Sequence, residues 1–236
     1  KDRETPNGQV DHSSFANNSQ MFYLAKEFED HMVGLSYDKF NLNSEMATGI
    51  PNFTLNMPQR DRRKIAGFYQ YEHDGSVVKK FQLDAYKQSI ERNFVQHIET
   101  NIPVPPPRTM KLIVDTDIQE QLDTLGINSQ LDFSVADDHY MIFGWQFTQD
   151  DLNKATENEQ QSFIKLPARP EIITNTTQLS IEDATLKTQA IYVQDEWRIS
   201  KPFIVTAGAR YYQVDANLNT TSKEGLAPNK NKDTKV

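Results

Sequence analysis

The side chains with the widest chemistry in this sequence are five histidines, because an imidazole can bind a metal ion or carry a proton near neutral pH. They are His12, His31, His73, His97 and His139. Their spacing supplies no partner for a metal site. The chain has no cysteine, which excludes Cys-based zinc and iron–sulfur sites. A role for any histidine therefore depends on the elements that position it.

Charged side chains form a few small groups. The pairs Asp115/Asp117 and Asp150/Asp151 offer the oxygen ligands that calcium prefers, but no Asp-x-Asp-x-Asp-Gly loop is present, so solvated charge is the better interpretation. The basic cluster at residues 60–64 could meet phosphates or an anionic ligand, or be a charged strand entry. Gly-x-Ser-x-Gly, His-Glu-x-x-His and phosphate-binding glycine loops are absent, so the sequence predicts no enzyme.

The composition combines a hydrophilic average with many aromatic residues. The chain has 236 residues, a net charge of −8, 37% hydrophobic residues, and 13 Phe, 9 Tyr and 2 Trp. The negative charge argues against a nucleic-acid partner held by phosphate contacts. No stretch approaches the roughly 18 apolar residues of a transmembrane helix, and residues 1–20 are too polar for a signal peptide.

Apolar side chains recur at every second position in several segments, which is the period of a strand with one apolar face. Between residues 203 and 213, for example, Phe203, Val205 and Tyr211 share a face. Short polar turns near residues 29–31, 73–76, 136–139 and 200–202 join such segments in pairs. The sequence thus predicts an all-β chain of four hairpins. Its strands are expected near residues 17–28, 32–44, 63–72, 77–91, 118–134, 140–152, 186–199 and 203–217.

The connections between the hairpins are expected to be long polar loops near residues 45–62, 92–117, 153–185 and 218–236. In an antiparallel meander, all short turns then lie at one end and all long loops at the other, which is typical of a transmembrane β-barrel of the outer membrane. Such a barrel needs only one apolar stripe per strand, which explains the low hydrophobic fraction. A soluble antiparallel β-sandwich, acting as an interaction or binding module, also alternates and stays open as the alternative.

One predicted hairpin resembles a recurrent element of TonB-dependent outer-membrane receptors, with the pattern Tyr-x-Gln-Asp-Glu-Trp followed by Thr-x-Gly-x-Arg-Tyr. It covers residues 190–212, including the turn at 200–202. The residues that carry the match are Tyr192, Gln194, Asp195, Glu196, Trp197, Gly208, Arg210 and Tyr211. Alternation places Tyr192, Gln194 and Glu196 on one face, which suits a wet lumen where carboxylates can pair with arginine.

Three further segments, residues 33–40, 54–62 and 83–94, resemble haem or haemoglobin receptors of that family, and colicin-receptor-like catecholate siderophore receptors are equally similar. The resemblance implies a receptor in the Gram-negative outer membrane that imports haem or a ferric siderophore as its transported ligand, with no intrinsic cofactor. It also implies energy from the TonB–ExbB–ExbD complex and contact with outer-membrane lipid and lipopolysaccharide. A haem-carrying protein, a bacteriocin or a phage would be further partners at the loops.

The sequence departs from the family pattern in three ways. The family has an N-terminal plug domain with a TonB box, a barrel of 22 strands, and, in haem receptors, NPNL and FRAP boxes with a histidine between them. None of the plug or of these boxes is found here, and about eight strands can be counted. Residues 1–236 are therefore expected to be part of a β-barrel domain, with the plug not present.

Topology sorts the histidines. His31, His73 and His139 fall in the short turns, which the family places on the periplasmic side. His12 and His97 fall toward the long-loop side, so they are the histidines that a haem iron arriving from outside could reach. An ordinary solvated histidine is the competing interpretation for both.

Overall fold

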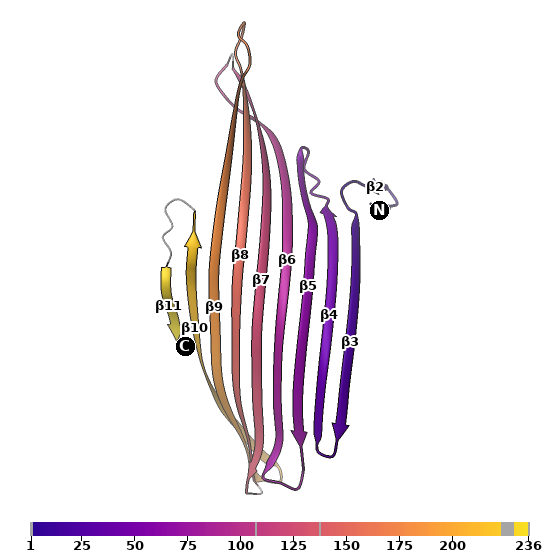
Figure 1. Ribbon diagram of the computed structural model, residues 1–236, viewed down its shortest axis with the longest axis vertical. Helices are drawn as coiled ribbons and strands as arrows, with labels where there is room; N and C mark the ends of the chain where they lie inside the picture. The colour runs from indigo at the N-terminus through magenta and orange to yellow at the C-terminus, as the bar shows by residue number, and fades with distance from the viewer. Residues whose placement is uncertain (1, 107, 137, 223–228, 236) are drawn as a thin grey trace.

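The computed structural model describes residues 2–106, 108–136, 138–222 and 229–235. Parts of three predicted segments lie outside these residues: 107 in the loop 92–117, 137 in the turn 136–139, and 223–228 and 236 in the last loop. Strands make up most of the described chain and form one large antiparallel sheet (Figure 1). A separate small hairpin, β1 (Arg3–Thr5) with β2 (Gly8–Val10), precedes it.

The large sheet is a meander in which each strand pairs with its neighbours in sequence. The spatial order is β11-β10-β9-β8-β7-β6-β5-β4-β3. The strands are β3 (Phe15–Phe28), β4 (His31–Met46), β5 (Phe53–Glu72), β6 (Val78–Ile102), β7 (Thr109–Val135), β8 (His139–Lys165), β9 (Ile172–Ser200), β10 (Phe203–Thr221) and β11 (Asn229–Lys235). The eight predicted strands correspond to β3–β10 in order, and β11 adds a ninth. The all-β fold predicted from the alternation is confirmed.

The long loops predicted from polar composition are, however, mostly strand. Strands β6 to β9 have 25 to 29 residues each and run far beyond the predicted limits. Within the three loops expected at 45–62, 92–117 and 153–185, the described residues without strand pairing are 47–52, 103–106 with 108, and 166–171. The prediction was wrong because backbone pairing continues where both faces of the sheet meet water, so the side chains no longer alternate. We call this end of the sheet the far end, and the end with the short turns the turn end.

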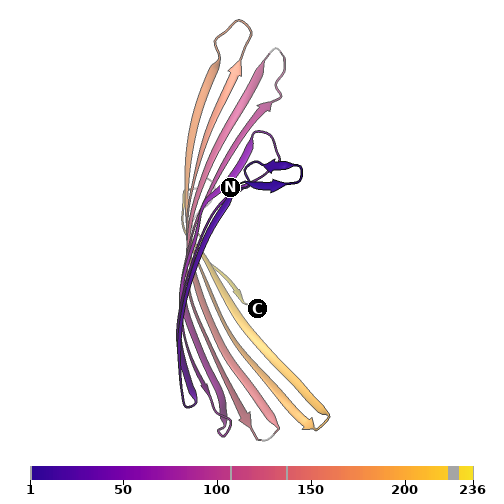
Figure 2. The same cartoon turned by 90° about the vertical axis from the view of Figure 1, so that its right-hand side faces the viewer.

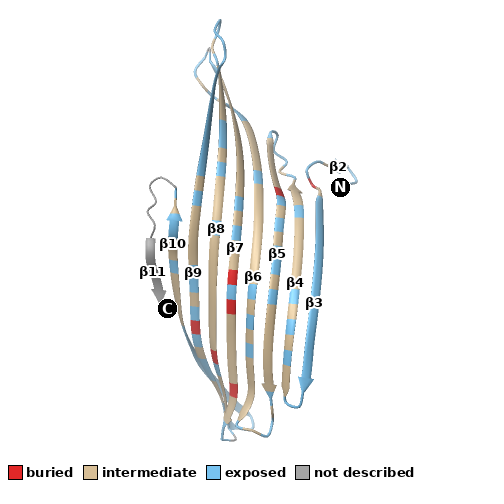
Figure 3. Cartoon of the chain, in the orientation of Figure 1, coloured by how far each residue is buried: buried red, intermediate tan, exposed pale blue. Residues whose placement is uncertain are grey.

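The sheet is a single layer with almost no core (Figures 2 and 3). Met57 and Ala190 are the buried hydrophobic residues of the described chain, and none of its side chains is fully buried. A soluble β-sandwich would bury the facing sides of two sheets against each other. The sandwich alternative is therefore wrong. The described residues include no helix long and apolar enough to cross a membrane.

The two faces of the sheet differ in chemistry. One face, which we call the inner face, carries the buried residues Thr124, Asp132 and Ala190. The opposite outer face carries exposed apolar residues near the turn end, for example Phe143, Ile191 and Val205. In β8 this apolar band comprises Met141, Phe143, Trp145 and Phe147. About eight strand residues, at roughly 3.3 Å each and with the usual tilt, give a height of about 20–26 Å, as expected for a membrane-spanning barrel.

The apolar band ends abruptly on its far-end side. In each strand from β3 to β10, the first outer-face residue beyond the band is polar. These residues are Gln20, Lys39, Arg63, Lys87, Asp123, Gln149, Gln189 and Gln213. The boundary therefore crosses eight strands at a similar level, as expected for a lipid–water interface rather than for scattered surface leucines.

Candidate functional site

The hairpin that resembles the family motif, β9 with β10, presents its polar residues on the inner face. Tyr192 is the direct cross-strand partner of Arg210, and Gln194 is the partner of Gly208. The Arg210 guanidinium lies 5.9 Å from the centre of the Tyr192 ring and donates a 2.6 Å hydrogen bond to Gln146 Oε1. The Tyr192 hydroxyl donates to Gln130 Oε1 at 3.0 Å. These bonds link β7, β8, β9 and β10 across the inner face.

Tyr192 lies flat over the neighbouring strand because that strand has a glycine beneath it. A Cβ atom at Gly144, its cross-strand partner in β8, would overlap the Tyr192 ring. The same arrangement recurs at Gly126 in β7, where Tyr86 of β6 covers the backbone. These Gly–Tyr pairs fix aromatic rings against the inner face without requiring a core.

The remaining motif residues lie on the other side of the sheet or continue the inner row. Asp195 and Trp197 are on the outer face at the turn end, where His139 Nδ1 lies 2.8 Å from Asp195 Oδ2 and its ring stacks on Trp197 at 5.5 Å. Tyr211 is half exposed on the outer face opposite Ile191. Glu196 continues the inner row opposite Thr206. The motif thus places side chains on both the inner face and the outer face of the sheet.

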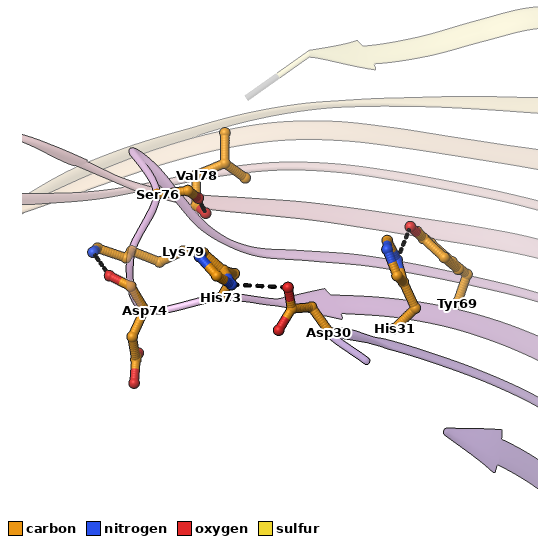
Figure 4. Close-up of polar contacts among 8 residues, drawn as sticks. All are labelled: Asp30, His31, Tyr69, His73, Asp74, Ser76, Val78 and Lys79. Atoms are coloured by element: carbon orange, nitrogen blue, oxygen red, sulfur yellow. Dashed lines mark hydrogen bonds and ion pairs between the residues drawn. The ribbon is translucent and has the colours of Figure 1, made fainter. Parts of the chain in front are cut away.

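The turn end carries the three histidines that the sequence placed in short turns. His31 Nδ1 lies 2.8 Å from the Tyr69 hydroxyl, and His73 Nδ1 lies 2.8 Å from Asp30 Oδ2 (Figure 4). The His31 ring also contacts Phe28 and Tyr71, at ring-centre distances of 5.3 and 5.2 Å. With the His139–Trp197 stack, these residues form a belt of histidines and aromatics at this edge of the apolar band, where amphipathic rings meet the interface.

His12 and His97 both lie at the far end, as predicted, but in different settings. His97 is inside β6 on the outer face rather than in a loop, and its Nδ1 lies 2.6 Å from Asp115 Oδ1. His12 lies in the turn between β2 and β3 with φ of 55°, and it lines a hollow of about 380 Å³ together with Met46 and Thr54. Thr54 is also the cross-strand partner of His97. The two candidate histidines therefore border neighbouring parts of the far end.

The basic cluster at residues 60–64 is divided between the two faces by strand alternation. Arg60, Arg62 and Lys64 lie on the inner face, and Arg63 lies on the outer face. Strand β6, which pairs with β5, adds Arg92 to the inner face, and β8, two strands beyond β6, adds Lys154. We call Arg60, Arg62, Lys64, Arg92 and Lys154 the inner basic ladder. The sequence identified the cluster at residues 60–64. Arg92 and Lys154 lie on the same face as this cluster because of the strand register, which the sequence did not reveal.

Ion pairs satisfy part of the inner basic ladder. Arg62 Nη2 lies 2.5 Å from Asp38 Oδ1, and Glu120 lies 2.9 Å from Arg92 and 3.9 Å from Lys154. Arg60 has no ion pair among the described residues, although it is the direct partner of Arg92. The Nε atom of Arg92 is buried and has no hydrogen-bond partner there. The ladder therefore retains unused donors beside two like charges.

Metal chemistry finds less support in the described part of the chain. It contains no group of three or more His, Asp or Glu side chains that could hold a metal ion. The inner basic ladder, by contrast, is an arrangement suited to anionic groups.

An open antiparallel meander, with one apolar band on its outer face and polar side chains on its inner face, defines part of a transmembrane β-barrel. The model of the family described as "TonB dependent receptor-like, beta-barrel" matches residues 5–236, and the chain belongs to this family. The family implies a location in the Gram-negative outer membrane. In such barrels the short turns are periplasmic and the opposite end is extracellular.

Comparison with solved structures identifies a similar chain described as "Copper transporter OprC". The two share 10% sequence identity with a TM-score of 0.34, and the match covers 92% of this chain and 52% of that one. This chain thus spans about half the length of that structure. A search of the curated proteins gave no match.

Proposed function

We propose that this chain is part of the barrel domain of a receptor that imports an anionic iron chelate, either haem or a ferric catecholate siderophore, using energy from TonB–ExbB–ExbD. Coupling to that complex would run through a plug domain. The observation that carries the proposal is the inner basic ladder, which lies on the far-end side of the apolar band and so faces the route of a ligand entering from outside.

The charge balance of the ladder favours an anion. Its five cations face four carboxylates along the same stretch of the inner face, so one positive charge is left over. These carboxylates are on Asp38, Glu120, Asp150 and Glu182. Arg60 and Arg92 stand directly opposite each other, an arrangement that destabilises a sheet unless an anion lies between them. The propionates of haem and the deprotonated oxygens of a ferric catecholate both supply such an anion, and guanidinium groups bind them with two parallel hydrogen bonds.

Haem would additionally need an axial ligand, and His97 and His12 are the candidates we propose. A ligating imidazole usually donates its second ring N–H to a carboxylate, which fixes the ring. His97 has this partner in Asp115, at 2.6 Å. Because His97 lies on the outer face, it would act at the rim of the far end. The connections there, at residues 47–52, 103–106 and 166–171, could also receive a haem-carrying protein, a bacteriocin or a phage.

Haem titration of the full-length receptor, followed in the Soret band, separates the two ligands. A Soret shift that is lost in His97→Ala or His12→Ala supports haem with a histidine ligand. No Soret shift, together with quenching of tryptophan fluorescence by a ferric catecholate, supports the siderophore. In either case Arg60→Gln/Arg92→Gln should weaken binding about 10- to 100-fold, the size expected for one or two charge-assisted hydrogen bonds. Unchanged affinity for both ligands in this variant would contradict the proposal.

A further inference from the structure

Three cations occupy the first outer-face positions beyond the apolar band in three adjacent strands. They are Lys39 in β4, Arg63 in β5 and Lys87 in β6. Lys39 and Arg63 are direct cross-strand partners, and Lys87 is the partner of Ile65, the last band residue of β5. Arg63 and Lys87 are exposed and Lys39 is half exposed. We call these three residues the outer cation row.

The outer cation row has no partner among the residues that the structure describes. Within the described residues, none of the three makes an ion pair or hydrogen bond, although carboxylates lie close by in β5 and β6. Those carboxylates are held by amides instead: Asp61 accepts from Asn41 at 2.5 Å and from Gln59 at 2.9 Å, and Gln59 also donates to Glu91. Three free cations at a lipid–water boundary attract phosphate headgroups.

A hollow of about 470 Å³ lies beyond the outer cation row, farther toward the far end. Six of its lining residues carry amides or a carboxylate and belong to the outer face by register: Gln59, Glu91, Asn93, Gln119, Gln121 and Asn153. Arg92, Glu120 and Lys154 lie between them in the strands and also line it. The Oδ1 atom of Asn93 is buried without a partner within the described chain, so at least one acceptor in the hollow is unused.

We infer that this surface binds a phosphorylated glycolipid of the outer leaflet. From the turn end toward the far end, the outer face carries the apolar band, then the outer cation row, then the amide-lined hollow. A phosphorylated glycolipid has acyl chains, phosphates and sugars in the same order, so each part of it would meet side chains of matching chemistry. Amides donate and accept at once, as sugar hydroxyls require. The cations lie at about the level where the headgroup begins, because they directly follow Tyr37, Ile65 and Ala85 of the band.

The outer cation row is distinct from the inner basic ladder, because strand alternation places the two on opposite faces of the sheet, although Arg92 and Lys154 of the ladder also line the hollow. Arg63 in β5 points away from the face that carries Arg62 and Lys64. The outer cation row of β4, β5 and β6 and the inner cations of β5 can thus be removed separately. The glycolipid inference requires only the membrane position of the band and does not depend on which chelate is imported.

The test uses the full-length receptor in detergent with three probes: rough lipopolysaccharide carrying its phosphates, the same molecule after dephosphorylation, and phosphatidylglycerol. Native mass spectrometry measures their binding. We expect the phosphorylated glycolipid to bind at least 10-fold more tightly than the other two, and salt to weaken it. Lys39→Gln/Arg63→Gln/Lys87→Gln should lose this preference, and Gln121→Ala/Asn153→Ala should reduce binding of the glycolipid but not of phosphatidylglycerol.

The matched control removes three cations from the inner face of β5, the strand that also carries Arg63. This variant is Arg60→Gln/Arg62→Gln/Lys64→Gln. It should bind the glycolipid like the wild type while losing affinity for the iron chelate. Equal binding of all three probes to the wild type would overturn the inference, and so would an outer-row variant that retains the preference. If the outer-row variant fails to fold, the comparison of the three probes on the wild type still decides the question.

Discussion

Arg60 of β5 and Arg92 of β6 are direct partners in the antiparallel ladder, so two guanidinium groups share the inner face on adjacent strands. Arg92 has an ion pair with Glu120, and Arg60 has none among the described residues. Opposed like charges cost free energy in a sheet that folds without ligand. Arg92 Nε also lacks a hydrogen-bond partner within the described residues. An anion that binds between the two arginines during the working cycle would explain why both are retained.

Arg60→Gln should therefore change stability and binding in opposite directions. Removing one of two opposed charges should raise the unfolding free energy of the unliganded receptor by about 0.2–1 kcal/mol, while affinity for the anionic chelate falls. Urea unfolding in lipid vesicles and ligand titration measure the two quantities. Arg62→Gln is the matched control, because Arg62 is already paired with Asp38 and its loss should not stabilise the sheet.

Gly144→Ala tests the packing of the motif tyrosine. The added Cβ would overlap the Tyr192 ring, so the ring must move and lose its hydrogen bond to Gln130. We expect a loss of about 1–3 kcal/mol in urea unfolding, the usual cost of overpacking. Gly67→Ala is the control, since its Cβ would meet only a carbonyl oxygen at 3.6 Å. Gly144→Ala should be rescued in the background Tyr192→Ser, and a failure of this rescue would show that the cost is not steric.

The turn half of the sheet could be predicted from the sequence because lipid imposes alternation there. Met141 to Phe147 have apolar side chains at every second position for this reason, and the β8 start at His139 agrees with the prediction. Beyond residue 149 the same strand meets water on both faces, and nothing in its sequence separates a paired strand from a polar loop. The far half of β6 to β9 was missed on these physical grounds.

The candidate sites, like the strands, could be predicted only in part from the sequence. The cluster at residues 60–64 was visible in the sequence, and strand alternation alone would have separated Arg63 from Arg62 and Lys64. The partners from other strands were not visible, because the register between β5 and β6 decides that Arg92 faces Arg60. The packing of Tyr192 on Gly144 likewise depends on pairing between segments far apart in the chain.

His139→Ala should lower the unfolding free energy more than a substitution that breaks an exposed ion pair at the same end of the sheet. Asp195 already has one buried oxygen without a partner in the described chain, and His139 is the partner of the other. Leaving both oxygens unpaired should cost about 1–3 kcal/mol in urea unfolding. His73→Ala, which breaks the more exposed pair with Asp30, should cost less than about 1 kcal/mol. The double change His139→Leu/Asp195→Leu should recover most of the loss, because it removes both polar groups at once.

An arginine scan along the outer face of β8 tests where the membrane lies. Phe143→Arg places a charge in the middle of the apolar band and should cost about 2–4 kcal/mol, whereas Gln149→Arg, just beyond the band, should cost about 0–1 kcal/mol. Both variants add one positive charge to the same face of the same strand, so depth is the main difference between them. Unfolding free energies in lipid vesicles measure the effect. Equal costs at the two positions would mean that the band does not face lipid, and the glycolipid site that follows from its boundary would then fail with it.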